Sequence, residues 1–152
     1  MHEAGRAMDI DLSSIGVSLT KFWEIAQAHG FFPIVSKPDS GMSESWHFDC
    51  RGSHHQVYEY VRAGKAGVAV PPYTQMAYSG ILAIGITLDA VPSQDNAYIQ
   101  AALIRLGFDP GRIDGIIGDR TKGAAKDAGI DLENPIDSLG EALRSKFSKE
   151  YA

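Results

Sequence analysis

Two histidines and two carboxylates in the first third of the chain have the types that a hydrolytic zinc site requires. Catalytic zinc takes three protein ligands, prefers imidazole nitrogen and carboxylate oxygen, and keeps a fourth position for water, whose pKa it lowers to roughly 7. A nearby carboxylate that is not a ligand can accept the proton of that water. We predict that His2, Asp9 and His47 are the zinc ligands and that Glu44 is the general base.

The chain around these residues reads as short strands. Residues 8–12 alternate between apolar and polar types, which predicts a strand that would hold Asp9 rigidly. Residues 45–49 predict a second strand that carries His47. Residues on opposite faces of a straight strand cannot reach one metal, so Glu44 and His47 can act together only if Glu44 lies in a bend before the strand.

The elements between these two strands are a helix and an edge strand. Ser18 is predicted to cap a helix over residues 19–29, with His29 in its last turn as a structural residue. A strand over residues 31–35 contains Pro33, which predicts a place at the edge of the sheet.

The two motifs around the predicted site resemble those of the LAS, or M15, peptidases. That family comprises D-alanyl-D-alanine carboxypeptidases and dipeptidases and phage L-alanyl-D-glutamate endopeptidases, which are zinc enzymes that cut peptidoglycan stem peptides. The resemblance covers roughly residues 1–65, and in the family a helical segment and an active-site arginine precede the first zinc histidine. Almost nothing precedes His2 and Arg6 is not in that place, so we expect the N-terminal part of the peptidase to be missing. The matching residues are His2, Gly5, Ala7, Asp9, Glu44, Trp46 and His47.

Each of these residues also has an ordinary structural interpretation. A lone histidine is more often a surface or packed residue than a ligand. Asp9 and Asp11 are typical of the solvated face of a half-buried strand, and Glu44 and Asp49 of solvated loop charges. The metal interpretation is favoured because all the motif positions are filled together.

A second pattern, in residues 93–130, resembles the peptidoglycan-binding domain 1 family, a small three-helix module that binds cell walls. Its glycines, aspartates and threonine set turns and cap helices, so the pattern indicates the module and assigns no ligand-binding residue. We expect helices over residues 96–106, 120–128 and 136–147, with Asp119 as an N-cap. The matching residues are Gln100, Leu103, Leu106, Gly107, Phe108, Asp114, Gly115, Gly118 and Thr121.

The predicted fold is therefore α+β. It comprises a shortened, small antiparallel-sheet peptidase domain over residues 1–70, a helical connector over 71–92 and a three-helix peptidoglycan-binding module over 93–152. The connector is expected to contain a helix over residues 74–84. A helix with Ser53 as its N-cap is expected to close the first domain, and His54 and His55 at its start are interpreted as structural.

Composition restricts the partners. A net charge of −5 with no basic run argues against nucleic-acid binding. The most apolar stretch, residues 76–91, is too short to span a bilayer, and Cys50 has no second cysteine to pair with. No signal peptide is visible, so we expect synthesis in the cytoplasm. We also expect a monomer whose partner is peptidoglycan and which acts at the cell wall or periplasm.

Two functions follow from these patterns. The first is a cell-wall hydrolase of the phage or prophage endolysin type, a zinc peptidase that cuts stem peptides. The alternative is a non-enzymatic peptidoglycan-binding protein derived from such an enzyme by N-terminal truncation.

Overall fold

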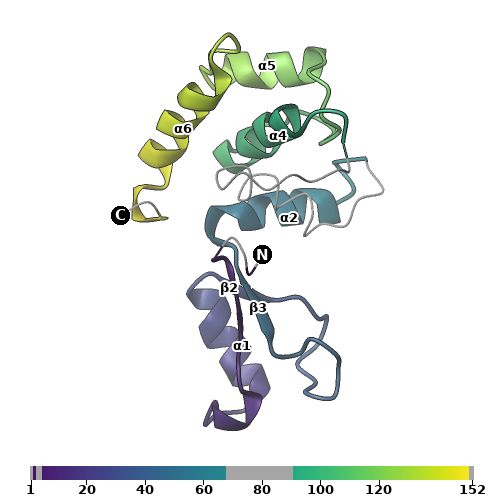
Figure 1. Ribbon diagram of the computed structural model, residues 1–152, viewed down its shortest axis with the longest axis vertical. Coiled ribbons are helices and arrows are strands. Elements are labelled where there is room, and N and C mark those ends of the chain that lie inside the picture. The colour runs from purple at the N-terminus through teal and green to yellow at the C-terminus, as the bar shows by residue number, and fades with distance from the viewer. Residues whose placement is uncertain (1, 3–4, 68–90, 151–152) are drawn as a thin grey trace. The chain divides into compact units, whose positions relative to one another are not determined.

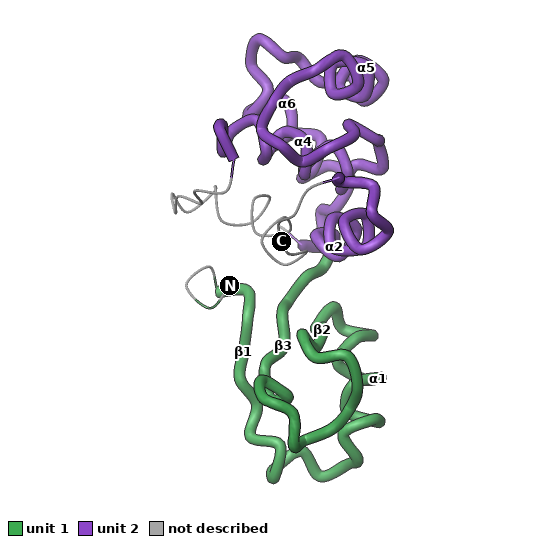
Figure 2. The backbone as a smooth tube through the Cα atoms, turned by 90° about the vertical axis from the view of Figure 1, so that its right-hand side faces the viewer, with its two compact units in different colours: residues 1–52 green, residues 53–152 purple. Residues whose placement is uncertain are grey.

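The computed structural model describes residue 2 and residues 5–67 and 91–150. The chain divides into two compact units, residues 1–52 and residues 53–152 (Figure 2). The expected α+β class is confirmed in its coarse form, because a small three-stranded antiparallel sheet is followed by helices (Figure 1). Within the described ranges, no helix has the length and apolar character needed to cross a membrane.

Unit 1 is built on a sheet of three short strands, β1 (Ala7–Asp9), β2 (Phe31–Pro33) and β3 (His47–Cys50). The strand order is β1-β3-β2 and both pairings are antiparallel, so β3 is central. The prediction that the strand containing Pro33 lies at an edge is confirmed.

Strand β1 is shorter than the predicted residues 8–12. The Asp11 carboxylate accepts hydrogen bonds from the Ser13 amide at 3.0 Å and from the Ser13 and Ser14 hydroxyls, each at 2.7 Å. These bonds start a 3₁₀ turn, η2 (Leu12–Ser14), and end the strand. They also hold the pKa of Asp11 below its ordinary value.

Helix α1 (Leu19–Ala28) lies against one face of this sheet. The prediction that Ser18 caps it is confirmed, because the Ser18 hydroxyl accepts from the Lys21 amide at 3.2 Å. Phe22 of α1 meets Phe48 of β3 edge to face, with ring centroids 5.2 Å apart. Since side chains alternate along a strand, the neighbours of Phe48 in β3, His47 and Asp49, project from the other face.

Unit 2 is helical. Its elements are α2 (His55–Arg62), α4 (Gln94–Leu106), α5 (Asp119–Asp127), α6 (Pro135–Lys146) and the 3₁₀ turn η5 (Ser148–Glu150), preceded by η3 (Gly52–His54). Helix α4 packs against α2, α5 and α6. The sequence predicts an apolar stripe of Ile99, Ala102, Leu103 and Leu106 on this helix, and the prediction is confirmed because all four belong to the core. The buried core residues are Ile99, Ala102, Leu103, Leu106, Ala124, Ala125, Ile130, Leu139 and Leu143.

Two predicted helix caps are wrong. Asp119 is the first residue of α5 and Gly118 is its N-cap, so the carboxylate favours the helix through the helix dipole rather than by capping. Ser53 does not cap α2, whose N-cap is His54. The Ser53 hydroxyl instead accepts from Arg105 at 2.8 Å and donates to Glu150 at 2.8 Å.

Helix α2 groups with the C-terminal helices, although the sequence led us to expect it in the first domain. Val57 is fully buried, and the Tyr60 hydroxyl donates to the Gly111 carbonyl at 2.9 Å and to the Asp109 carboxylate. The boundary between the two compact units therefore falls between residues 52 and 53 of the chain. The predicted connector helix over residues 74–84 lies outside the described residues.

Candidate metal centre

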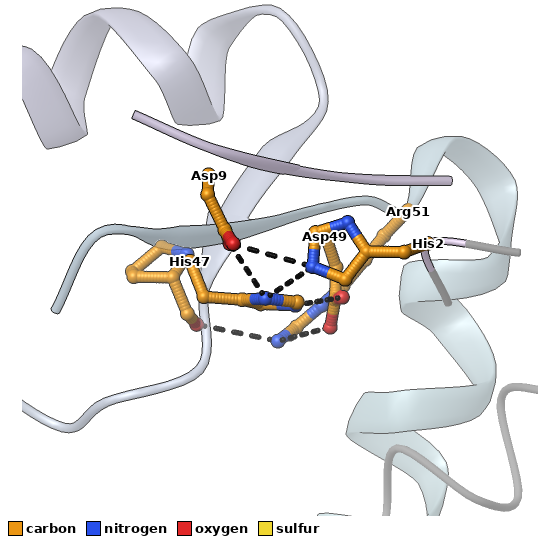
Figure 3. A network of polar contacts seen from close by, with 6 residues as sticks. His2, Asp9, His47, Asp49 and Arg51 are labelled. Carbon is orange, nitrogen blue, oxygen red and sulfur yellow. Dashed lines mark hydrogen bonds and ion pairs between the residues drawn. The ribbon is translucent and has the colours of Figure 1, made fainter. Parts of the chain in front are cut away.

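Three side chains of unit 1 converge on one point. His2 Nε2 lies 3.0 Å from His47 Nδ1 and 3.3 Å from Asp9 Oδ1, and His47 Nδ1 lies 3.2 Å from Asp9 Oδ1 (Figure 3). They are the only group of three or more histidine, cysteine, aspartate or glutamate side chains among the described residues with ligand atoms close enough to share a metal ion. The structure thus brings together all three predicted ligands.

Strand register and one glycine account for this convergence. Asp9 and His47 are direct partners in the antiparallel β1–β3 ladder, so their side chains lie side by side on one face. Gly5 has a φ of +63°, a left-handed conformation that favours glycine, and its amide donates to the His2 carbonyl at 2.8 Å. This turn places His2 beside the strand pair, so the glycine of the motif has a definite structural task.

The distances suit zinc. Three ligands of a tetrahedral zinc, each about 2.0–2.1 Å from the metal, lie about 3.3–3.4 Å from one another. The three separations of 3.0–3.3 Å are close to that value. Two imidazole nitrogens and one carboxylate oxygen are also ligands that zinc prefers.

The contacts of His47 are also compatible with a bound cation. His47 Nε2 lies 3.0 Å from Asp49 Oδ1, and an ionised carboxylate only accepts hydrogen bonds, so the imidazole proton belongs on Nε2. In neutral His47 the lone pair is then on Nδ1 and faces a carboxylate oxygen of Asp9. A positive charge between the two atoms, whether a proton or a metal ion, would satisfy both lone pairs.

Access to the three ligands is open on one side. The side chains of His2 and Asp9 are 50% and 55% exposed, whereas that of His47 is 12% exposed. His2 and Asp9 are therefore accessible to solvent, whereas His47 is mostly covered.

Glu44, the predicted base, lies in the turn that precedes β3. Its φ of +65° is positive, which is uncommon for a residue other than glycine, and its carbonyl accepts from the His47 amide at 3.0 Å. The adjacent Ser45 is fully buried and donates through its hydroxyl to the Ser40 carbonyl at 3.2 Å. The Glu44 side chain is exposed and is not a member of the three-residue ligand group.

Asp49 is the residue whose importance the sequence did not reveal. Solvent exposure was one interpretation of it, yet it is only 1% exposed and contacts the nitrogen of His47 that faces away from Asp9. The signal was available in the spacing: two residues apart on a strand, His47 and Asp49 must share a face.

The polar side chains of the motif in unit 2, by contrast, form hydrogen bonds with other groups of unit 2. The Gln100 side-chain oxygen accepts from the Asp114 and Gly115 amides at 3.1 and 2.9 Å, and its nitrogen donates to Asp114 Oδ1 and the Ile116 carbonyl, each at 3.0 Å. Thr121 donates to the Pro110 carbonyl at 3.1 Å. A hollow of about 270 Å³ borders these residues, but their polar atoms already have partners.

The chain was compared with family models, curated proteins and solved structures, and none of them matches it. The strongest functional indication in the described part of the molecule is therefore geometric: two imidazole nitrogens and one carboxylate oxygen at the mutual distances of zinc ligands.

Proposed function

We propose that this chain is a zinc-dependent peptidase that cuts the stem peptides of peptidoglycan, as endolysins of phages and prophages do. The observation that carries the proposal is the set of separations, 3.0–3.3 Å, between His2 Nε2, Asp9 Oδ1 and His47 Nδ1. The resemblance of the surrounding motifs to LAS peptidases supports the choice of substrate.

The proposed roles follow from the chemistry of each residue. His2, Asp9 and His47 would hold zinc, which when bound supplies a Lewis acid that lowers the pKa of water and polarises a carbonyl. Glu44 would accept a proton from the attacking water and pass it to the leaving amine. Glu44 lies in the turn before β3, three residues ahead of His47, and is outside the ligand set, as a base must be.

Unit 2 is proposed to hold the enzyme on the cell wall. Its helices α4, α5 and α6 surround one core, which suits the three-helix wall-binding module that the sequence resembles. Binding of a second module to the same polymer raises the local substrate concentration without any new catalytic contact.

The test is the Glu44→Gln variant of the full chain. Glutamine has nearly the same shape but cannot accept a proton at neutral pH, so stem-peptide release from purified walls should fall by roughly 10²–10⁴ while zinc content is unchanged. Glu24→Gln is the matched control, because Glu24 is an exposed carboxylate on α1 that pairs with Lys21 and lies outside the ligand group. Zinc loss in Glu44→Gln would make Glu44 a ligand and overturn its assignment as a base.

A non-enzymatic wall-binding function is the second candidate, supported by the helical core of unit 2, which could serve wall binding whether or not unit 1 binds zinc. The same experiment separates the two. If the wild-type chain sediments with insoluble peptidoglycan but binds no zinc and releases no peptide, wall binding is the function and the peptidase proposal is wrong.

A further inference from the structure

Alternate residues of β3 and its continuation form a buried polar row on one face of unit 1. His47, Asp49 and Arg51 follow one another at a spacing of two, and their side chains are 12%, 1% and 2% exposed. Figure 3 shows this row leading from Arg51 through Asp49 to His47 and on to His2 and Asp9. A buried aspartate and arginine are costly unless they are paired, so the row calls for an explanation.

We propose that Asp49 is a positioning residue: it fixes the tautomer and the orientation of His47, so that Nδ1 presents its lone pair to the metal. The contact that carries this is His47 Nε2 to Asp49 Oδ1 at 3.0 Å. Because Asp49 is a carboxylate, it accepts, and the imidazole proton is held on Nε2. Metal-binding histidines commonly donate their other N–H to a carboxylate in this way, which raises the basicity of the ligand nitrogen.

Arg51 holds Asp49 in turn. Its Nη2 lies 3.6 Å from Asp49 Oδ2 and donates to the Pro33 carbonyl at 3.3 Å, and its guanidinium lies 5.3 Å from the centre of the Phe32 ring. Phe32 is also the register partner of Asp49 in the β2–β3 ladder. The edge strand β2 thereby anchors the cation that faces the Asp49 carboxylate.

The two oxygens of Asp49 have different environments. Oδ2 has no hydrogen-bond partner among the described residues and faces Arg51, whereas Oδ1 faces His47. The negative charge of Asp49 is thus balanced on one side, and its other oxygen is available to the imidazole. In this arrangement His47 has one ring orientation in which Nε2 contacts Asp49 and Nδ1 faces Asp9.

The proposal rests on the proposed zinc function only for its consequence on metal affinity; the tautomer can be measured without metal. In ¹H–¹⁵N spectra of metal-free wild-type protein at mildly alkaline pH, where imidazoles are neutral, His47 should be the Nε2–H tautomer. In Asp49→Asn the amide can donate as well as accept, so the Nδ1–H form should become populated. Zinc affinity, measured against a competing chelator, should fall roughly 10- to 100-fold.

Asp39→Asn is the matched control, because Asp39 is an exposed carboxylate of unit 1 that accepts from the Gly41 amide and does not contact the row. It should change neither the tautomer nor the zinc affinity. The result that would overturn the proposal is an Nδ1–H tautomer in the wild type, a measurement that needs no variant to fold. An unchanged tautomer in a folded Asp49→Asn protein would also overturn it.

These outcomes are separate from those of the proposed function. If the wild type binds no zinc, the peptidase proposal fails, and the tautomer of His47 still decides the role of Asp49. If the wild type binds zinc and Asp49→Asn lowers the affinity without altering the tautomer, the peptidase proposal stands and the positioning role of Asp49 is wrong.

Discussion

In unit 1 the polar side chains of the motif face one another, whereas in unit 2 they are bonded mainly to the backbone that surrounds them. His2, Asp9 and His47 place three ligand atoms within 3.3 Å of one another. Gln100, which is 1% exposed, uses its amide oxygen and nitrogen to hold the loop before α5. A motif of polar residues can thus serve chemistry or serve the fold, and the hydrogen-bond partners distinguish the two.

The strongest test of this contrast removes the inward-facing amide of unit 2. Gln100→Leu keeps a similar volume but leaves the Asp114 and Gly115 amides and the Ile116 carbonyl without their partner. Ile116 is exposed, so water can satisfy its carbonyl, whereas each of the two amides costs roughly 1–3 kcal/mol when left unsatisfied. Unit 2 should therefore lose about 2–6 kcal/mol of unfolding free energy. Urea unfolding followed by far-UV circular dichroism measures this loss.

Gln27→Leu, on the exposed side of α1, is the matched control and should be nearly neutral. If Gln100→Leu were equally neutral, the hydrogen bonds of Gln100 would not hold the loop. The motif would then be open to a binding role, and the contrast between the units would fail.

Zinc should act on unit 1 alone. Both tryptophans, Trp23 and Trp46, belong to unit 1, so their fluorescence reports its unfolding, while most of the helical circular dichroism comes from unit 2. A free zinc concentration of 100 times Kd should stabilise unit 1 by about 2.7 kcal/mol and leave the circular dichroism transition nearly unchanged. His47→Ala should abolish the effect.

His29→Ala provides the comparison for that variant, since His29 is an exposed histidine at the end of α1. It should retain the zinc effect. A zinc-dependent shift that persists in His47→Ala, or one that appears only in circular dichroism, would contradict the proposed ligand set.

Two glycines of unit 2 test whether its backbone conformation, like its hydrogen bonds, serves the fold. Gly115 has a φ of +74°, and a Cβ there would lie 2.7 Å from the Ser93 carbonyl oxygen, so Gly115→Ala should cost about 1–3 kcal/mol. Gly123 lies within α5, and a Cβ there would meet nothing within 4 Å, so Gly123→Ala should stabilise by about 0.5–1 kcal/mol. The unfolding free energy measured in urea should therefore fall in Gly115→Ala and rise in Gly123→Ala. A change of the same sign in both variants would contradict the structural roles assigned to these glycines.

The smallest effect concerns pH and unit 2. The hydrogen bond from Tyr60 holds the pKa of Asp109 below its ordinary value, while burial, together with the same contact, raises the pKa of Tyr60. A carboxyl whose pKa is depressed on folding stabilises the folded state above its unfolded pKa of about 3.9, and this stabilisation is lost as pH falls through the folded pKa. The side chain of Asp109 is 47% exposed, so solvent screens the effect.

Asp109→Asn should therefore remove part of the acid sensitivity of unit 2. Urea midpoints measured from neutral pH down to about pH 3 should fall more steeply in the wild type than in the variant. Asp127→Asn, at the exposed end of α5, should follow the wild type. A variant curve parallel to that of the wild type would show that the Tyr60–Asp109 contact does not contribute.

The sequence by itself was enough for several local elements and for the types of the site residues. The Ser18 cap of α1, the edge position of Pro33 and the buried stripe of α4 follow from periodicity and backbone chemistry that act over a few residues. Likewise, two histidines and an aspartate could be selected as metal ligands because zinc preference depends on atom type.

Only the tertiary structure decided which of these residues meet. The register that pairs Asp9 with His47, the burial of Asp49 and its support by Arg51 depend on contacts between strands that are far apart in the chain. The grouping of α2 with α4 likewise depends on Val57 and Tyr60 finding partners beyond residue 91. Such pairings are selected by the packing of whole elements, which local spacing does not specify.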